Sequence, residues 1–585
     1  ETHLGDGLLE SSGSHFMSDK HKKLEELRSQ RWFAPDTIRA FAHRQRMQQI
    51  GLRREEFMGK PVVAILNTWS ELSPCHSHLR ERAEAVKRGV WAAGGFPVEL
   101  PVQSVGEVMV KPTTMLYRNL LAMETEELLR SLPIDGAVLL GGCDKSTPGL
   151  LMGALSMDLP ILYCPAGPMS NGQWRGVKTG AGTHTKKFWD ERRLGLIDTV
   201  AWEELEGAMT RSIGTCNTVG TASTMTSIAD AIGFTLPGAS SIPAADAGHP
   251  RMASQCGETI VDLIWRDRRP STWLTPAHFA NGVAVYMAMG GSTNAAIHLI
   301  AIARRAGIDL TLEQLAETAA KIPVLLNLFP SGNALMEDYH FAGGLRALMR
   351  EITPFLALDC AGATGQTWDA LLADAKCYDN DIIRSLDNPV VGLDQGATLA
   401  LLRGNLCPDG AVMKSSAASP ALRKHSGPAL VFDDHETLSR MIDDPGLQIT
   451  ADTVLVLRNA GPVGAPGMPE WGNLPIPKKL LEAGVRDMLR ISDSRMSGTH
   501  YGSCVLHVAP EAAVGGPLCL VRSGDIIDLD IDAGTLNMRV SDEELARRRA
   551  AHVPVHRQYG RSFAALYQQH VTQANEGCDF DFLQA

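Results

Sequence analysis

The chain has 585 residues, of which 44% are hydrophobic and 21% are charged, so it is long enough for two or three globular domains. This length excludes a single small binding module, and the composition excludes a disordered or fibrous protein. The net charge is −11 and no concentrated run of Lys and Arg occurs, which excludes a surface suited to nucleic acid.

The start of the chain and its cysteines bear on where the protein works. Residues 1–16 are rich in Gly, Ser and His and precede Met17, so we interpret them as a remnant of expression. No secretory leader is recognised, and the eleven cysteines include no CxxC pair. This pattern fits a reducing compartment better than a disulfide framework, which predicts a cytoplasmic protein.

The first two thirds of the chain alternate between strand and helix patterns. Apolar residues at helical spacing over 79–90, followed by Gly94-Gly95, predict a helix with a glycine stop. Residues 134–140 predict a strand, followed by a glycine turn and a helix from Pro148 onward. We therefore expect residues 17–388 to form an N-terminal α/β layered domain.

One uncharged stretch, residues 278–303, is long enough to cross a bilayer. Its middle reads Gly290-Gly-Ser-Thr-Asn294, which is too polar and too rich in glycine for a membrane helix. No membrane span is predicted. The motif itself suits either an anion at the start of the next helix or a simple helix cap.

After about residue 388 the pattern changes to short β-rich runs, including 453–457 and 505–508. Residues 526–532 and 535–540 alternate with a period of two around an Ala-Gly turn, which predicts a hairpin. Ser541 with Glu544 predicts the capped start of a final helix. We expect residues 389–585 to form a smaller, β-rich and barrel-like C-terminal domain with flanking helices, completing an α/β protein.

Three cysteines lie in turns where a thiolate could be stabilised by backbone N–H groups: Cys75, Cys143 and Cys216. Taken singly, each is more often a small buried hydrophobic residue. Zinc-ribbon and ferredoxin spacings are absent from the sequence. A metal centre would therefore need ligands from distant segments.

Several polar residues also occur in loops that are rich in glycine or proline. Carboxylates such as these suit Mg²⁺ when they are gathered, although each taken alone is more often a surface acid. The segment 491–502 concentrates hydroxyl groups, but it is neither a nucleophile elbow nor a phosphate-binding loop. The residues concerned are Glu107, Asp144 with Lys145, Glu470, and Ser497 with Thr499.

Six groups of motifs together resemble the signature series of the dihydroxy-acid and sugar-acid dehydratases, the IlvD/Edd family. They occur in the family's order over nearly the whole chain from about residue 30. They read Pro74-Cys-His76; Gly141-Gly-Cys-Asp-Lys145 with Pro148; Gly214-Thr-Cys216 with Thr221-Ala-Ser-Thr-Met225; Gly290-Gly-Ser-Thr-Asn294; Gly467-Met-Pro-Glu470; and Ser494-Arg-Met-Ser-Gly498.

The resemblance implies a role for each of these polar residues. Cys75, Cys143 and Cys216 match the ligands of a [2Fe–2S] cluster with one open iron position. The resemblance further implies that Mg²⁺ stabilises an enediolate, that the cluster acts as a Lewis acid on the C3 hydroxyl, and that a homodimer or homotetramer forms. Glu107, Asp144 and Glu470 match the family's Mg²⁺ ligands, and Lys145 matches a carbamylated lysine that binds the same ion. Ser497 matches the catalytic base. Thr499 and Arg495 are expected to contact the substrate.

The implied reaction is dehydration of a 2,3-dihydroxy acid to a 2-keto-3-deoxy acid. The sequence 214–224 and the end Gly577-Cys-Asp-Phe-Asp-Phe-Leu583 resemble the sugar-acid members, so a pentonate or hexonate such as L-arabinonate or D-xylonate is expected. Polar Asn217 and Thr218 would suit such a substrate if they face the pocket.

Three alternatives stay open at this point. The first is the dihydroxy-acid dehydratase of branched-chain amino-acid synthesis. The second is a non-enzymatic iron–sulfur sensor, although no basic DNA-reading face accompanies the cysteines. The third is a glycine-loop nucleotide-binding protein, against which the absence of the two standard phosphate-loop motifs counts.

Overall fold

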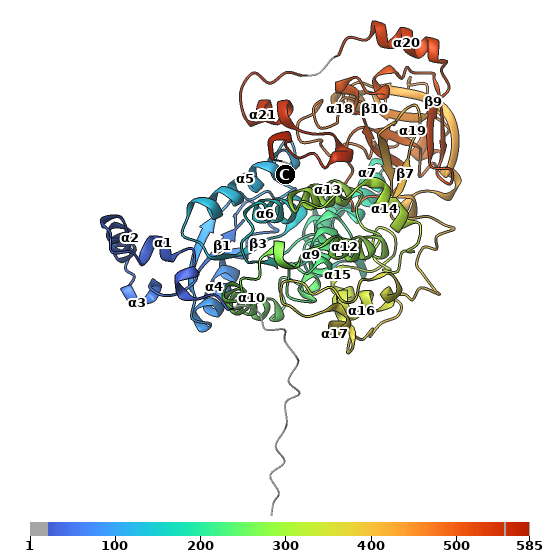
Figure 1. The fold of residues 1–585 in the computed structure, drawn as a ribbon. Helices are drawn as coiled ribbons and strands as arrows, with labels where there is room; N and C mark the ends of the chain where they lie inside the picture. The colour runs from blue at the N-terminus through green and yellow to red at the C-terminus, as the bar shows by residue number, and fades with distance from the viewer. Residues whose placement is uncertain (1–20, 555–556, 584–585) are drawn as a thin grey trace, which may run out of the picture.

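The computed structural model describes residues 21–554 and 557–583, so the predictions for residues 1–16 and for Met17 lie outside it. Two sheets organise these residues into a larger part, drawn in blue to yellow, and a smaller part in orange to red (Figure 1). The α/β class and the barrel-like second part, both expected from the sequence, are confirmed.

The first sheet has four parallel strands in the order β2-β1-β3-β4. Helices α4 and α10 lie on one side of this sheet and α5 and α6 on the other (Figure 1). Because β1 and β3 are buried along their whole length, they are continuous apolar runs, as parallel strands covered on both faces must be. The strands are β1 Val62–Asn67, β2 Phe96–Pro101, β3 Gly136–Gly141 and β4 Ile161–Pro165.

Most of the remaining first part is helical and packs into one large hydrophobic core. A short hairpin, β5 Gly172–Trp174 with β6 Val177–Thr179, interrupts the helices. The helices are α1 Gln30–Phe33, α2 Ile38–Gln49, α3 Arg54–Phe57, α4 Leu79–Ala92, α5 Met115–Ser131, α6 Cys143–Met157, α7 Thr183–Arg193, α8 Thr199–Met209, α9 Thr221–Ile232, α10 Gly248–Trp265, α11 Pro270–Trp273, α12 Pro276–Ala288, α13 Asn294–Arg305, α14 Leu312–Ala319, α15 Met336–Phe341, α16 Gly344–Glu351 and α17 Trp368–Leu372.

The second sheet has eight strands in the order β14-β13-β9-β10-β11-β12-β8-β7. Arg403, which directly follows β7, bridges to Thr535 at the start of β14, so the two edges of the sheet meet and the barrel is nearly closed. Its elements are β7 Ala400–Leu402, β8 Gly410–Met413, β9 Lys424–Phe432, α18 His435–Met441, β10 Val454–Leu457, α19 Lys478–Glu482, β11 Arg490–Ser492, β12 Cys504–Ala509, β13 Ile526–Asp530, β14 Thr535–Met538, α20 Asp542–Ala551 and α21 Phe563–His570.

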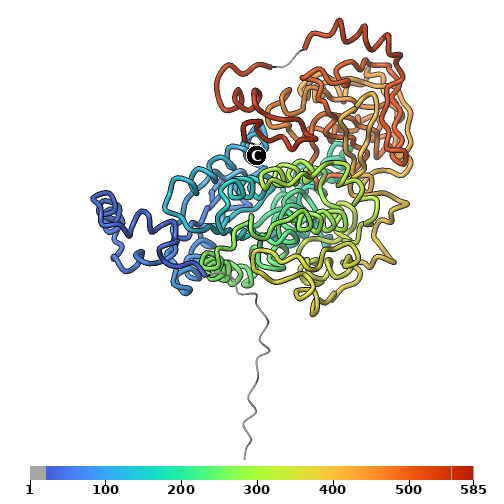
Figure 2. Tube along the Cα trace, viewed as in Figure 1, coloured from blue at the N-terminus to red at the C-terminus, as the bar shows by residue number. Residues whose placement is uncertain are grey.

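The end of the chain returns to the first part, as the red trace in Figure 2 shows. The fully buried guanidinium of Arg118 on α5 donates to the carbonyl oxygens of Gly577 (2.9 Å) and Cys578 (2.8 Å). Tyr567 of α21 packs with Leu116. These contacts join the two parts on the side of the sheet where α5 lies.

Several predicted elements are confirmed, including the helix over 79–90 as α4 and the hairpin as β13 and β14. The helix expected from Pro148 onward begins five residues earlier, at Cys143, and Pro148 lies inside it. Pro148 lies in the second turn of α6, where a proline removes a single intrahelical hydrogen bond, and the fully packed helix tolerates this loss.

The uncharged stretch 278–303 forms two helices, α12 and α13, separated by the glycine-rich turn. Within residues 21–554 and 557–583, no helix is both long and apolar enough to cross a bilayer.

The segment that follows residue 388 leads from the first part to the second sheet. Residues 390 and 391 still pair with Val324 of the first part, and the second sheet begins at Ala400. The domain boundary near residue 388 stays a prediction, as do the cytoplasmic location and the homo-oligomeric state.

Candidate active site

The predicted site residues of the first part gather at the carboxyl ends of its four parallel strands. Cys75 follows β1, Glu107 follows β2, and Cys143 begins α6 directly after β3. Cys216 comes from a distant loop, but its neighbour Thr215 pairs with the segment after β4, donating its N–H to the carbonyl oxygen of Gly167 at 2.9 Å. This edge is where α/β sheets place their ligands.

Two buried histidines tie these strand-end loops together. His76 Nε2 donates to the Gly142 carbonyl at 2.8 Å, and its Nδ1 lies 2.8 Å from Ser104 Oγ. His78 Nε2 donates to the Ala166 carbonyl at 2.8 Å. Burial lowers the pKa of both rings to about 4, so both are neutral at pH 7 and serve as hydrogen-bonding links.

The three cysteine thiols belong to one electrostatic cluster. A hydrogen bond with the thiol of Cys143, together with burial, raises the pKa of Cys75 well above its ordinary value. Burial, Asp144 and Cys143 likewise raise the pKa of Cys216. All three cysteines are free, and thiolates gathered in this way require a positive centre to offset their charge.

The acidic residues and Lys145 form a second cluster beside the thiols. Lys145 is fully buried, and its Nζ contacts Glu107 Oε2 at 2.6 Å, Asp144 Oδ2 at 3.2 Å and Glu470 Oε1 at 3.4 Å. The backbone N–H of Glu107 also donates to Cys143 Sγ at 3.4 Å, which joins the two clusters. Three carboxylates from three segments therefore converge on one cation, close to the sulfur atoms.

The charges in this cluster depend on one another. Burial and Arg495 act to lower the pKa of Lys145, but the three carboxylates outweigh them and raise it. Burial raises the pKa of Asp144 to about 6 despite the opposing charge of Lys145. For Glu470, burial acts to raise the pKa, but the charges of Lys145 and Arg495 prevail and lower it.

Glu470 reaches the cluster from the second part of the molecule and is held by two buried side chains. Arg495 Nη1 donates to Glu470 Oε1 at 2.9 Å, while its other nitrogens donate to the Met468 carbonyl and to Thr113. Asn294 Nδ2 donates to the same Glu470 oxygen at 2.7 Å. Arg495, expected to contact the substrate's carboxylate, thus has protein partners that fix Glu470.

Ser497 and Thr499 lie in the loop between β11 and β12. Their hydroxyl oxygens are 2.9 Å apart, and Ser497 is half-buried. The intervening Gly498 lies so close to the turn before α13 that a Cβ there would meet Ser292 Cβ at 2.4 Å. Ser292 bonds Thr221 at 2.9 Å, and Asn294 donates to both Thr221 and Glu470. Direct contacts thus connect the Ser497 loop to the Lys145 cluster.

Asn217 and Thr218 do not present their polar groups to a substrate. The Asn217 side chain accepts from the N–H of Ala181 and donates to the Ser170 carbonyl, both at 3.0 Å. Thr218 Oγ1 donates to the Ala181 carbonyl at 3.1 Å. These contacts do not fit the expectation that the two side chains bind a polyol. Instead, Asn217 and Thr218 satisfy backbone groups of the loop before α7 and so hold that loop in place.

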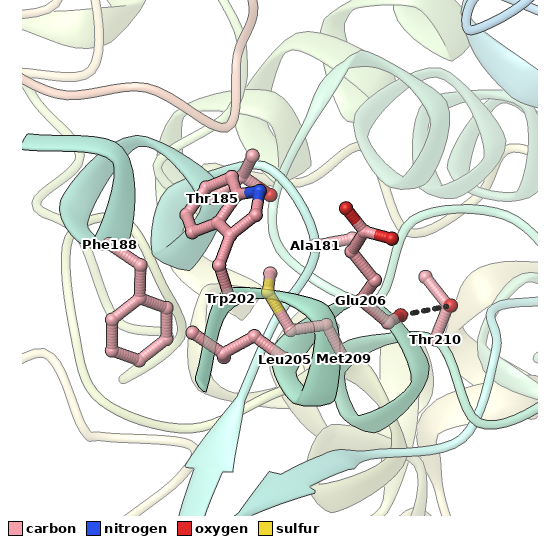
Figure 3. A pocket seen from close by; sticks show the side chains of 8 residues that line it. All are labelled: Ala181, Thr185, Phe188, Trp202, Leu205, Glu206, Met209 and Thr210. Atoms are coloured by element: carbon pink, nitrogen blue, oxygen red, sulfur yellow. Dashed lines mark hydrogen bonds between the residues drawn. The ribbon is translucent and has the colours of Figure 1, made fainter. Parts of the chain in front are cut away.

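Two cavities flank α7, which lies where the two parts meet (Figure 1). The cavity of about 210 Å³ between α7 and α8 is mostly apolar, with Phe188, Trp202 and Leu205 around it (Figure 3). The other, of about 490 Å³, is lined by both polar and apolar residues; they include Tyr501 and Thr183, which bonds Thr499. The apolar cavity contains none of the predicted site residues.

The carboxylates and thiols of this site have the chemistry that Mg²⁺ and an iron–sulfur cluster require of their ligands. In the part of the chain that the structure describes, no three or more His, Cys, Asp and Glu side chains are arranged to hold a metal ion as they stand. The carboxylates are instead gathered around the Lys145 ammonium, which occupies the position of a cation. Oxygen donors of this kind suit Mg²⁺, and free thiols suit iron.

Sequence reasoning missed the residues that orient this site. Asn294 lay in a motif interpreted as a cap or an anion site, and its contact with Glu470 spans 176 positions. Thr114, whose hydroxyl donates to Glu107, carried no signal at all. His76 was visible only as part of a family motif. Each would have required knowledge of the three-dimensional contacts.

Comparisons with known proteins agree with this arrangement. Residues 60–371 match the N-terminal model, and residues 381–578 the C-terminal model, of the dihydroxy-acid/6-phosphogluconate dehydratases. The chain is 91% identical to a 6-deoxy-6-sulfo-D-gluconate dehydratase of Pseudomonas putida, covering 97% of this chain and 98% of that one.

Two further relatives lie at lower identity. An L-arabonate dehydratase of Azospirillum brasilense is 48% identical, covering 95% of this chain and 97% of that one. A dihydroxy-acid dehydratase of Caldanaerobacter subterraneus is 36% identical, covering 92% and 97%. The chain therefore belongs to the dihydroxy-acid/6-phosphogluconate dehydratase family and is a hydro-lyase.

Proposed function

We propose that this enzyme dehydrates a six-carbon sugar acid with an anionic group at C6, and that 6-deoxy-6-sulfo-D-gluconate is its first candidate substrate. The support is the 91% identity to a dehydratase of that name, against 48% to an L-arabonate dehydratase and 36% to a dihydroxy-acid dehydratase. A hexonate is thus favoured over the pentonates L-arabinonate and D-xylonate, and over the branched-chain acid.

The observation that carries the proposal is that thiols, carboxylates and a serine lie close together where the first and second parts of the molecule meet. In the proposed reaction the C2–H bond breaks, the C3 hydroxyl leaves as water, and the resulting enol becomes a 2-keto-3-deoxy acid. Both bonds resist cleavage at neutral pH, so a base at C2 and an electrophile at C3 are needed together. A site built from both parts of the molecule can supply them on opposite sides of a substrate.

We assign the base to Ser497, with Thr499 as its partner. Their hydroxyl oxygens lie 2.9 Å apart, so Thr499 can orient the Ser497 oxygen toward C2 and hydrogen-bond the substrate. Ser497 is half-buried, whereas Thr499 is almost fully buried. The more accessible hydroxyl is the one that a substrate can reach.

Cys75, Cys143 and Cys216 would hold a [2Fe–2S] cluster, and Glu107, Asp144, Glu470 and Lys145 would hold Mg²⁺. When bound, these groups supply Lewis acids, the cluster toward the departing C3 hydroxyl and Mg²⁺ toward the carboxylate end of the substrate. Glu107 links the two sets, since its side chain contacts Lys145 while its N–H contacts Cys143. The protein's task is to fix these donors around one substrate.

Lys145 would take part as a carbamate, which forms when its ammonium group releases two protons to solvent and its nitrogen bonds the carbon of carbon dioxide. The ammonium contributes one positive charge to a cluster of three carboxylates. A carbamate and Mg²⁺ together contribute the same net charge. The exchange therefore leaves the electrostatic balance with Arg495 unchanged, provided that the ion and the carbamate arrive together.

The function is tested by measuring keto-acid formation with anaerobically reconstituted enzyme. The substrates are 6-deoxy-6-sulfo-D-gluconate, D-gluconate, L-arabinonate, D-xylonate and 2,3-dihydroxy-isovalerate. We expect the sulfonated hexonate to have the highest kcat/KM, at least about tenfold above the branched-chain acid. Preference for 2,3-dihydroxy-isovalerate would reject the sugar-acid assignment. A cluster spectrum with no turnover of any acid would instead favour the sensor.

A further inference from the structure

The larger of the two cavities beside α7, of about 490 Å³, lies next to the candidate active site and has a mixed lining that includes charged side chains. Thr183, the first residue of α7, lines it and donates its hydroxyl to the Thr499 carbonyl at 2.5 Å. Gly182 lies so close to Thr499 that a Cβ there would meet its hydroxyl oxygen at 2.1 Å. On another wall, the Phe329 carbonyl accepts from the N–H of Val219, three residues after Cys216. The cavity therefore adjoins both the Ser497 loop and the Cys216 loop.

The charged residues of this cavity are all basic. Among the described residues that line it there are two lysines and no Asp or Glu. Lys187 is about half exposed, and its Nζ lies 4.0 Å from its nearest acid, Glu191, so its charge is only loosely paired. Lys178 is also half exposed but is paired with Asp338 at 2.7 Å. Lys187 is thus the cation that is most available to an anion.

His184 lines the same wall. It is 5% exposed, and its Nδ1 accepts from the N–H of Gly180 at 2.9 Å. Burial and Lys187 lower its pKa, so the ring is neutral and its proton resides on Nε2. Thr183 and Lys187 are four residues apart and share one face of α7, whose N-terminus also favours negative charge.

The other cavity beside α7, on the side where α8 lies, differs in character. Figure 3 shows Phe188 beside Trp202 and Leu205 of α8, in the smaller cavity, where the lining is mainly apolar. An anion placed there would lose its hydration without gaining partners. Of these two cavities, the one lined by Thr183, His184 and Lys187 offers the imidazole and ammonium donors next to the Ser497 loop.

We propose that the cavity beside α7 is the subsite for the anionic far end of the sugar acid, with Lys187 and His184 Nε2 as its main donors. This inference rests on the proposed function and adds to it the residues that select a C6 sulfonate. A substrate whose reacting carbons lie between Ser497 and the thiols would extend its C6 end past Thr183 into this cavity. D-gluconate, which carries a neutral hydroxyl at C6, would gain little from Lys187.

The test compares 6-deoxy-6-sulfo-D-gluconate with D-gluconate in wild type and in two variants, Lys187→Gln and Lys187→Glu. We expect Lys187→Gln to lower kcat/KM for the sulfonated acid about five- to tenfold, mainly through KM. Lys187→Glu should lower it at least about thirtyfold, because it places like charges together. The values for D-gluconate should change less than about twofold in both variants.

A matched control is Lys478→Gln on α19. Lys478 is 50% exposed and lies 3.9 Å from Glu482 four residues later, whereas Lys187 is 56% exposed and lies 4.0 Å from Glu191. Lys478 does not line the cavity, so this variant should leave both substrates unaffected. Raising the salt concentration should also raise KM for the sulfonated acid more than for D-gluconate in wild type, and this difference should vanish in Lys187→Gln.

The outcomes separate the subsite from the function. If wild type dehydrates the sulfonated acid but Lys187→Glu does so equally well, the subsite is wrong and the proposed function stands. Equal losses for both substrates would also reject it, because they would indicate a structural role. If wild type dehydrates D-gluconate but not the sulfonated acid, the subsite loses its ligand and the C6 assignment fails. No turnover of any sugar acid would reject the function and the subsite with it.

Discussion

The two parts of the molecule hold their shares of the site in different ways. In the first part, Cys75, Glu107 and Cys143 follow successive strands of one parallel sheet, and neutral histidines join their loops. In the second part, Glu470 lies in a long loop whose start is held by buried carboxylates. Asp493 accepts from the N–H of Ala460 at 3.0 Å, and Glu511 from that of Gly464 at 2.9 Å.

In the first part, the sheet topology determines where the candidate metal ligands lie. In the second part, specific side-chain contacts determine the positions of Glu470 and Ser497. Strand ends in one sheet stay together as long as the sheet folds, so the thiols tolerate changes elsewhere. Glu470 and Ser497 depend on a few specific contacts, with Arg495, Asn294 and the close approach of Gly498. Substitutions in the second set should therefore impair turnover while the cluster is retained.

The largest expected effect comes from Cys143→Ser in the first part. Loss of one of three thiols should bleach the visible absorption of the reconstituted enzyme and abolish turnover, because the cluster lacks a ligand. Iron content and the spectrum measure this directly. Cys360→Ser, which changes a buried cysteine outside the site, should keep both. A full cluster with full activity in Cys143→Ser would refute the ligand assignment.

Next in size is Ser497→Ala, in the second part. It should lower kcat by about 10²- to 10⁴-fold, the usual contribution of a general base, while the cluster spectrum stays that of wild type. Exchange of the C2 proton for deuterium, followed by NMR, isolates the step. Exchange at the wild-type rate in this variant would show that another group takes the proton.

Gly498→Ala tests whether packing alone places Ser497. A methyl group there would lie 2.4 Å from Ser292 Cβ, so the loop must shift. Because a displacement of about 1 Å can cost 10²-fold in rate, we expect kcat to fall by about that factor with the cluster intact. The control is Gly207→Ala on α8, where nothing lies within 4 Å. Equal rates in both variants would show that the loop position is not critical.

Asn294→Ala should have the smallest of these effects. It removes the donor 2.7 Å from Glu470 Oε1 but leaves Arg495 in place. Outer residues that orient metal ligands typically contribute about 10- to 100-fold to metal affinity or activity, so the Mg²⁺ concentration for half-maximal rate should rise by about tenfold. A Mg²⁺ titration of the rate measures it. An unchanged titration would mean that Arg495 alone positions Glu470.

The comparison also explains how much the sequence could reveal. The helical spacing over 79–90 and the period of two over 526–540 gave correct elements, because each pattern reports a local burial that the structure keeps. Cys143 could be placed just after the strand expected over 134–140 for the same reason. The start of α6 was missed, because Pro148 is tolerated inside a helix that is packed on all sides.

Side-chain direction was beyond local patterns. Asn217 and Thr218 looked like substrate contacts beside Cys216, yet both serve the loop before α7. Asn294 and Arg495 are polar, buried and distant in sequence from Glu470, which both of them contact. No periodicity in the sequence marks such residues. Long-range contacts of this kind are set by the packing of the two parts, which the sequence shows only through resemblance to relatives.

The most direct test of the central claim, that both parts build one site, is a crystal structure of the enzyme reconstituted anaerobically with iron, sulfide, Mg²⁺ and carbon dioxide. The account predicts one [2Fe–2S] cluster on Cys75, Cys143 and Cys216. It also predicts Mg²⁺ on Glu107, Asp144, Glu470 and a carbamylated Lys145, with Ser497 facing the space between them. An active crystal with the cluster on other cysteines, or with Glu470 and Ser497 turned away from the metals, would contradict it.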